Sequence, residues 1–528
     1  MNKRIALLLL VAPIIAPQTV DSMVQCINPE GNREVKALGK SFFSVRPSFQ
    51  LNSPEFLAGW WYDRMDAKGK ECRNGSLQLV ALGGKSTDSY DLARYFTFNN
   101  SSTLHISEAD GIVLNNPIPD VDILANQIGV YTKNGNFESE LSFHPRYSFG
   151  GLGISYRQEF AQRSDGRAFW FLASAPILHV KTGMHICENV INDGGGVLTA
   201  DIPAGVVVYP NATEAFAQPT FEYGKIVAEN KARWGLGDVT LLIGYKTVAH
   251  DDYDMNGYIG ALVPTGTHVK AREMFESIVG NNHHAGLILG SSSHVTLWSC
   301  ENGARLDFEF NSNGQYLFKS KEVRSIDLKN KPWSRYMQMY ASAADAIPAY
   351  TADNPLLNIT PGINILTKEV NVYPGFSTTS NTAVTYTTSC GSKQLELGYN
   401  FYARQAEYVE LACPWKVGPA LKGLHPGGST DSVQQIGDNF NALNAVNATG
   451  GAFSTAEYNS TEIKVTDLDM LSASHPAIIS NTLYANASYR CNEHEYPRFV
   501  SAGGSYEFTE DNTTLNRWTI WLKGGISF

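Results

Sequence analysis

The chain ends in NRWTIWLKGGISF, residues 516–528, where apolar and polar side chains alternate almost without a break. Counting back in twos from the last residue gives an apolar face that contains Phe528, Ile526, Leu522, Ile520 and Trp518. Because successive side chains of a β-strand point to opposite faces, the pattern predicts a strand with one apolar and one mostly polar face. A soluble β-sheet protein can end in the same pattern, so the alternation alone does not distinguish a soluble strand from a transmembrane one.

A terminal strand that ends on an aromatic residue, with tryptophans on both faces, resembles the closing strand of Gram-negative outer-membrane β-barrels. In that class the terminal aromatic residue is a signal for the barrel-assembly machinery. The resemblance implies an assembly signal made of Trp518, Ile520, Leu522, Ile526 and Phe528. It also implies that the apolar face meets outer-membrane lipid, while Arg517 and Lys523 face a lumen.

Composition narrows the class of protein. Only 17% of the 528 residues are charged, while there are 46 glycines, 25 tyrosines and 25 phenylalanines, which suits a barrel with aromatic girdles. A mean hydropathy of -0.20 argues against a helical membrane protein, which needs several long apolar runs. A net charge of -10 without a basic tract argues against a nucleic-acid partner.

The N-terminus predicts export. Lys3 and Arg4 precede an apolar run from Ile5 to Ala16, which is too short to span a bilayer and is typical of a secretory signal. We therefore expect a signal peptide over residues 1–22. Export and the C-terminal strand together predict the outer membrane of a Gram-negative bacterium as the location.

Alternating stretches recur upstream and predict an all-β, antiparallel up-and-down barrel over residues 139–528. The count is about 14 strands, with 12 or 16 as alternatives, by analogy with the even numbers of bacterial barrels. Strands are expected to begin near Asn516, Arg498, Thr482, Lys393, Ser380, Leu357, Arg335, Ala304, His284, Asp254, Gly237, Arg167, Leu152 and Ser139. Residues 23–138 precede them and form either a plug inside the lumen or an extra hairpin.

Short and long connections between these strands alternate along the chain. Short turns such as residues 164–166 and 391–392 alternate with long connections, above all 184–234 and 407–479. Short periplasmic turns opposite long extracellular loops are typical of a transmembrane barrel, and the parity places the C-terminus at the periplasmic rim. Within the long loops, the spacing of apolar residues predicts short amphipathic helices over 429–445 and 272–279.

Charged residues on the polar faces are candidates for lining the lumen. They have mixed signs, and they either rigidify the wall through ion pairs or select solutes by their field. The candidates are Arg157, Glu159, Arg305, Asp307, Glu309, Glu396, Arg404, Arg490, Arg498 and Lys523.

Other reactive residues show weaker patterns. His284 with Ser291 would suit a barrel lipase or acyltransferase, but no GxSxG motif accompanies them, and we expect no enzyme. The seven cysteines leave one unpaired, and Cys187 with Cys413 is a candidate disulfide in the long loops. The periplasmic strand ends carry a second group, made of Cys300, Cys390 and Cys491. No metal site or cofactor is expected.

Two short motifs carry a resemblance to a family. Gly235-Leu236-Gly237-Asp238 opens one strand, and Leu262-Val263-Pro264-Thr265-Gly266 closes the next. They resemble the outer-membrane transporters of long-chain fatty acids and aromatic hydrocarbons, which are barrels with an N-terminal plug. The resemblance implies a porin-like channel for passive passage of small solutes, with hydrophobic solutes as one option. The alternative is a structural or adhesive surface barrel without a transport role.

Overall fold

The computed structural model describes residues 34–59, 74–108, 121–199, 202, 206–250, 252–342, 345, 358–416, 418–421, 462–491 and 496–528. Within these residues, twelve strands form a closed circle in which all neighbours pair antiparallel. The circle closes where the C-terminal strand pairs with Gly75–Ser86. The predicted all-β, antiparallel barrel is therefore confirmed, with the lower of the two alternative strand counts.

The barrel strands follow one another around the wall in chain order. Their bounds are β1 (Gly75–Ser86), β5 (Arg146–Phe160), β6 (Phe169–Gly183), β9 (Val239–His250), β10 (Tyr253–Val263), β11 (Gly286–Ser299), β12 (Arg305–Leu317), β18 (Gly375–Thr387), β19 (Lys393–Arg404), β23 (Ile478–Cys491), β24 (Arg498–Phe508) and β25 (Arg517–Ser527). One further strand, β8 (Lys231–Leu236), pairs with the part of β6 that extends beyond β9.

The two faces of the barrel wall differ in polarity, with the apolar face outward as contact with lipid requires. Outward-facing side chains are large, apolar and exposed, among them Leu79, Leu152, Ile177, Ile243, Ile259, Leu289, Leu397, Leu483 and Ile520. Inward-facing positions are mostly polar and buried, as in β25, where Arg517, Thr519 and Lys523 are buried between exposed neighbours. Leaving apolar area in water costs about 25 cal/mol per Å². A belt of such side chains around a closed barrel is a lipid-facing surface, and the predicted outer-membrane barrel is confirmed.

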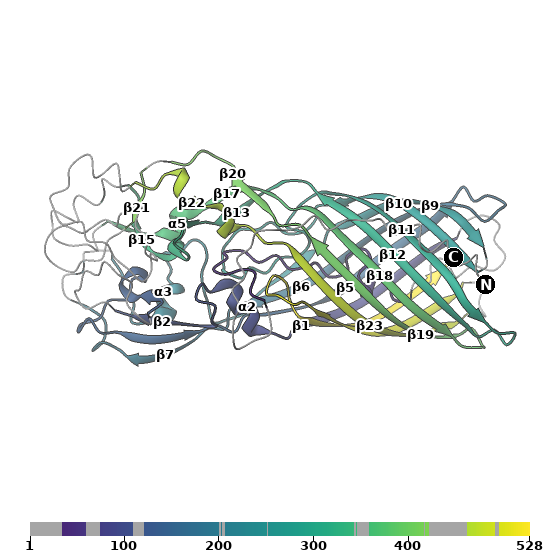
Figure 1. The fold of residues 1–528 in the computed structure, drawn as a ribbon, viewed down its shortest axis with the longest axis horizontal. Helices are drawn as coiled ribbons and strands as arrows, with labels where there is room; N and C mark the ends of the chain where they lie inside the picture. The colour runs from purple at the N-terminus through teal and green to yellow at the C-terminus, as the bar shows by residue number, and fades with distance from the viewer. Residues whose placement is uncertain are drawn as a thin grey trace.

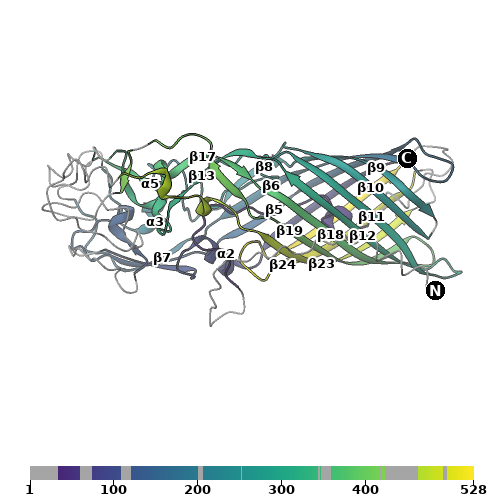
Figure 2. The ribbon, with the colours of Figure 1, turned by 45° about the horizontal axis from the view of Figure 1, so that its top comes forward.

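The connections sort by length to the two ends of the barrel (Figure 1). Short turns follow β5, β9, β11, β18 and β23 at the end where the C-terminus lies. The long connections at the other end are residues 87–145, 184–238, 264–285, 318–374 and 405–477. We call these five connections the cap. Their described parts extend well beyond the barrel in both views (Figures 1 and 2).

The cap has secondary structure, and its buried apolar side chains form one continuous core with those of the lumen segment and the barrel. Its strands are β2 (Thr103–Ser107), β3 (Ile123–Leu124), β4 (Glu138–Ser142), β7 (Cys187–Asn192), β13 (Ser320–Ser325), β14 (Asp327–Leu328), β15 (Gln338–Tyr340), β16 (Ile359–Pro361), β17 (Thr367–Tyr373), β20 (Tyr408–Leu411), β21 (Ala420–Leu421) and β22 (Leu468–Asp469). Its helices and 3-10 turns are α2 (Ser89–Phe96), η1 (Ala125–Ile128), α3 (Ala212–Phe216), η2 (Ser334–Tyr336), α5 (Gly362–Leu366), η4 (Val465–Asp467) and η5 (Met470–Ala473). Trp333, which is fully buried, packs edge-on against Phe143 and Phe216 in this core.

Three of the expected strand starts do not begin barrel strands. The one near Ser139 falls in β4, and those near Arg335 and Leu357 fall beside β15 and β16 of the cap. Short cap strands alternate like barrel strands, because a small sheet over a local core has the same period of two. The expected helix over 272–279 is also wrong, since these residues are irregular or bent. The expected helix over 429–445 and the expected signal peptide lie outside the described residues.

Among the described residues, no helix is both long and apolar enough to cross a membrane.

Candidate functional site

A stretch of chain near the N-terminus occupies the inside of the barrel. Residues 35–59, which we call the lumen segment, contact inward-facing side chains at both ends of the wall. Near the cap, Asn512 Nδ2 donates a hydrogen bond to the carbonyl of Ala37 at 2.7 Å. Near the short turns, the backbone N–H of Gly59 donates to Glu396 Oε2 at 2.7 Å. The segment thus runs lengthwise through the lumen before the chain returns as β1.

Ionic contacts hold the half of the lumen segment that lies nearer the cap. Arg46 Nη1 lies 3.4 Å from Glu507 Oε1, and its Nη2 donates to Asn400 Oδ1 at 2.8 Å. Glu507 also pairs with Arg517 Nε at 2.6 Å, while Arg517 Nη1 donates to the carbonyl of Arg46 at 3.0 Å. Glu507 therefore joins two buried arginines, one from the segment and one from the closing strand.

A lysine of the closing strand holds the other half, nearer the short turns. Lys523 is 1% exposed, and its Nζ donates to the carbonyls of Phe56 at 2.9 Å and Ala58 at 2.7 Å. These carbonyls lie at the C-terminal end of the short helix α1 (Pro54–Leu57), inside the barrel. A helix C-terminus carries partial negative charge, so a cation is favoured there. The lysine thereby ties the end of the segment to the wall.

The wall and the lumen segment also meet through close packing. Phe49 lies against Gly153 of β5, where an added Cβ would come within 2.5 Å of the Phe49 ring. Phe49 also contacts Phe56 at a ring-centroid distance of 5.4 Å. A residue without a Cβ is what lets the segment approach the wall so closely here.

A buried charge network fixes the segment where it enters the barrel. Arg324 of β13 pairs with Glu322 at 2.7 Å and with Glu407 at 3.2 Å, and its guanidinium lies over the Phe42 ring. Burial opposes ionisation of Glu407, but Arg324 and Arg404 outweigh it and lower its pKa to about 2. Burial, assisted by Arg404, lowers the pKa of the adjacent His475 to about 3. The network therefore holds a carboxylate beside a neutral imidazole at neutral pH.

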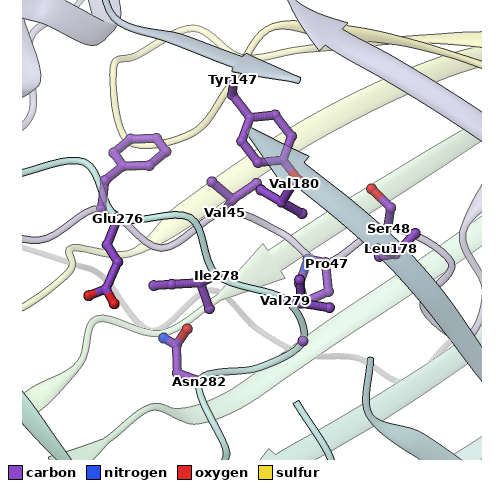
Figure 3. Close-up of a pocket in the computed structure, with 12 residues that line it drawn as sticks. Val45, Pro47, Ser48, Tyr147, Leu178, Val180, Glu276, Ile278, Val279 and Asn282 are labelled. Atoms are coloured by element: carbon purple, nitrogen blue, oxygen red, sulfur yellow. The ribbon is translucent and has the colours of Figure 1, made fainter. Parts of the chain in front are cut away.

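Two adjoining cavities remain between the lumen segment and the wall. The first is small, with about 20 Å³ of space for the centre of a water-sized molecule, and has a mainly apolar lining from the segment, β6 and residues 276–282 (Figure 3). Its lining comprises Phe43, Val45, Pro47, Ser48, Tyr147, Leu178, Val180, Glu276, Ile278, Val279, Gly280 and Asn282. The second cavity shares Pro47, Ser48 and Leu178 with the first and extends to Thr240 and Leu262. Together they follow the segment along one side of the lumen.

The two motifs of the sequence resemblance meet beside these cavities. The backbone N–H of Gly266 donates to Asp238 Oδ1 at 2.9 Å, and Thr265 Oγ1 donates to the carbonyl of Gly237 at 2.6 Å. Asp238 also accepts the backbone N–H of Asn281 at 2.6 Å. These bonds anchor the connection 264–285 at the junction of β8 and β9, so that residues 278–282 line the cavities.

Most of the predicted lumen residues lie on the inward face. Arg157, Glu159, Asp307, Glu396, Arg404 and Lys523 are buried, and Arg305, Glu309 and Arg490 are half-buried. Ion pairs join Arg157 to Glu159 at 3.6 Å and Arg305 to Asp307 at 2.8 Å. Arg498 is the exception, because it is exposed and shares the outward face of β24 with Val500. A strand residue of that parity cannot face the lumen, so this assignment is corrected.

Sequence reasoning missed three kinds of lumen residue. Glu507 and Asn400 were not singled out, although both contact Arg46. His294 of β11 lies between two carboxylates, 3.2 Å from Asp254 and 3.0 Å from Asp307. A plug inside the lumen was one of two alternatives for residues 23–138, but the sequence does not show which of these residues enter the barrel. Inward parity on the strands was the one signal that could have found Glu507 and His294.

The residues of the predicted assembly signal lie as a lipid-facing strand requires. Trp518, Ile520 and Leu522 are exposed on β25, and Ile526 is half-buried. Phe528 exchanges backbone hydrogen bonds with Gly75, at 2.8 and 2.9 Å, and its ring stacks on Tyr156 at 6.3 Å. Recognition by the assembly machinery stays a prediction.

The described residues form neither the catalytic pair nor the disulfide that the sequence analysis considered. His284 is buried, and its two ring nitrogens lie 2.8 Å from Glu322 and 2.8 Å from the carbonyl of Phe318. Neither nitrogen is therefore free to activate Ser291, as the enzyme alternative requires. The five described cysteines are free, which removes the candidate disulfide between Cys187 and Cys413. No cluster that could hold a metal ion occurs among the described residues.

Comparison with solved structures finds other outer-membrane barrels. An outer membrane channel of Pseudomonas putida F1 is 7% identical, with 88% of this chain and 98% of that chain covered and a TM-score of 0.36. A FadL homologue of Pseudomonas aeruginosa is 9% identical, with coverages of 93% and 96% and a TM-score of 0.26. The toluene transporter TodX of Pseudomonas putida is 8% identical, with coverages of 96% and 99% and a TM-score of 0.23. Neither a protein-family model nor a curated protein matches the sequence.

The last two of these structures belong to the family that the sequence motifs resemble, and the resemblance is as weak as the motifs suggest. Sequence identities below 10% and TM-scores below 0.5 do not assign this chain to that family. The assignment as an outer-membrane β-barrel therefore rests on this chain's own strand pairing and apolar belt.

Proposed function

We propose that the protein is a channel that lets small solutes, including hydrophobic ones, cross the outer membrane passively. The observation that carries the proposal is the pair of apolar-lined cavities beside the lumen segment. Ligand sites are typically concave and apolar with a few polar groups, and the first cavity combines Val45, Leu178 and Val180 with Glu276 and Asn282. Because the cavity lies inside a membrane-spanning barrel, a solute would occupy it on the way across the membrane.

The lumen segment acts as the plug in this proposal. It runs along the barrel from the cap to the short turns, and its polar contacts with the wall are concentrated at Arg46 and at Lys523. Passage requires the segment to shift away from the wall, while the barrel itself stays closed. Ion pairs such as Arg157 with Glu159 rigidify the wall in this view.

A structural or adhesive surface barrel is the alternative, and the folded cap supports it, because a cap that extends well beyond the barrel offers a large surface (Figure 1). Reconstitution into planar bilayers and liposome swelling with small solutes separate the two functions. A channel gives discrete conductance steps and solute-dependent swelling. Absence of both, with a correctly folded barrel, would overturn the proposal.

A matched pair of variants ties permeation to the cavity. Leu178→Asp places a carboxylate in the apolar lining, where burial of an unpaired charge is unfavourable, and is expected to reduce permeation of apolar solutes. Val190→Asp makes the same change on exposed β7 of the cap and is expected to leave permeation unchanged. Equal permeation by both variants would show that solutes do not pass the cavity.

A further inference from the structure

A basic cluster lies on the outer surface of the barrel near the cap. Strand pairing places Lys85 of β1 opposite Ser148 of β5, and Ser148 opposite Lys181 of β6. Arg146 lies two residues along β5 from Ser148 and therefore on the same face. The three basic side chains are exposed. With strands about 4.8 Å apart, Lys85 and Lys181 lie about 10 Å from each other across Ser148.

The charge of this cluster is uncompensated. Within the described residues, no ion pair involves Lys85, Arg146 or Lys181, whereas other basic residues such as Arg167 and Lys321 have a carboxylate partner. The outward faces of β1, β5 and β6 carry neither Asp nor Glu. Three cations that converge on a hydroxyl form a site for an anionic group with several acceptor oxygens, of which phosphate is the usual example.

Aromatic side chains flank the cluster at the level of the membrane interface. Trp518 of β25 lies directly opposite Lys85, and Tyr506 of β24 lies opposite Trp518. On the other side, Trp234 of β8 is 67% exposed and stacks on His179 at 4.7 Å. Tryptophan and tyrosine concentrate at membrane–water interfaces, so the cluster lies where lipid headgroups lie.

Small residues lead along the outer wall from the cluster toward the middle of the membrane. Gly83 and Gly150 face outward and lie opposite each other, two residues from Lys85 and Ser148. An added Cβ would meet a backbone carbonyl at 3.3 Å for Gly83, which is a tight contact, and at 3.7 Å for Gly150, so packing does not demand a glycine at position 150. Ala81, which lies opposite Leu152, continues this surface of small residues on β1. Small side chains leave room for an acyl chain to lie against the wall.

We propose that Lys85, Arg146, Lys181 and Ser148 bind the phosphate group of a lipid in the leaflet on the cap side, whose acyl chain lies along Gly83 and Gly150. The ligand class is a phosphorylated glycolipid or phospholipid. The site rests on the membrane location of the barrel and is independent of any solute that crosses the lumen. The bound lipid fastens β1, β5 and β6 together next to the strand pair that closes the barrel.

The test measures lipid binding by native mass spectrometry of the folded protein in mild detergent. The probe is bisphosphorylated lipid A, compared with its dephosphorylated form and with inorganic phosphate. The triple variant K85Q/R146Q/K181Q is expected to bind the probe about tenfold more weakly than the unaltered protein, because each lost cation removes a charge-assisted contact. The matched control R163Q/R167Q/R498Q removes the same charge from exposed residues near the short turns and is expected to bind normally.

The proposal is overturned by undiminished binding of the triple variant, by an equal loss in the control, or by equal binding of the dephosphorylated lipid. Binding of inorganic phosphate alone would also contradict a lipid site. If the triple variant does not migrate as a folded barrel on gels before heating, G150L covers the surface of small residues instead and is expected to weaken lipid binding. Bilayer conductance of each variant is expected to be unchanged, which separates this site from the proposed channel.

Discussion

Replacing Lys523 with methionine is expected to release the end of the lumen segment that lies near the short turns. The lysine donates two hydrogen bonds, to the carbonyls of Phe56 and Ala58, in a site that is 1% exposed. A hydrogen bond from a charged group contributes about 1.5–3 kcal/mol, so losing two costs the seated segment roughly 3–6 kcal/mol. Because 1.4 kcal/mol corresponds to about tenfold, even the lower figure shifts the seated-to-released equilibrium by more than about a hundredfold.

Two assays measure the release of the lumen segment. In planar bilayers, Lys523→Met is expected to give larger and longer conductance steps than the unaltered protein, and Lys523→Arg, which keeps the donors, is expected to change them less. In an Ala58→Cys background, the released thiol is expected to react with a membrane-impermeant maleimide added on the short-turn side. Lys523→Met with Ala58 retained measures the labelling of the native cysteines. If Lys523→Met leaves both conductance and labelling unchanged, the lysine does not hold the segment.

Three further predictions concern acid stability, thiol reactivity and packing. The folded pKa of His475, about 3, lies below its ordinary 6.5, so the folded state resists protonation and stability falls as pH drops from about 6.5 toward 3. Glu407, whose pKa is lowered from 4.5 to about 2, stabilises the fold above pH 4.5 and loses that effect as pH falls through 2. Between pH 6.5 and 4.5 the loss of stability comes from His475, so His475→Gln should make the heat-denaturation midpoint less dependent on pH in that range; an unchanged slope would refute this. Hydrogen bonds from Ser392 and Thr388 lower the pKa of the exposed Cys390 to about 6, so iodoacetamide should alkylate it at neutral pH and Ser392→Ala should slow the reaction; equal rates would contradict the cause. Gly153→Leu should displace Phe49 and lower the denaturation midpoint, whereas Gly257→Leu, on the outward face with open space around it, should not, and equal midpoints would argue against the close contact.

The barrel strands could be predicted from the sequence because their constraint is local. Lipid on one face and a polar lumen on the other impose a period of two along each strand, as in β25 and β19. The expected starts near Lys393 and Arg498 coincide with the bounds of β19 and β24. Loop parity also placed the two longest connections, 184–234 and 407–479, at the same end of the barrel, where the structure has 184–238 and 405–477.

The lumen could not be predicted in the same way. The lumen segment is mostly irregular in the structure, and its partners are hundreds of residues away in the chain, as with Arg46 and Glu507. β1 was left among the N-terminal residues, because only its pairing with β25 shows that it closes the wall. Arg498 was misplaced because it was judged by its charge, although its parity with Val500 already pointed outward. The boundaries of the signal peptide and of the N-terminal region stay predictions.

Solute uptake by intact cells tests the central claim most directly. Gram-negative cells that produce the unaltered protein, Leu178→Asp or Val190→Asp at equal levels in the outer membrane would be supplied with a radiolabelled small apolar solute. The cavity path predicts faster initial uptake with the unaltered protein and Val190→Asp than with Leu178→Asp or with cells lacking the protein. Equal uptake in all four would contradict a channel through the lumen.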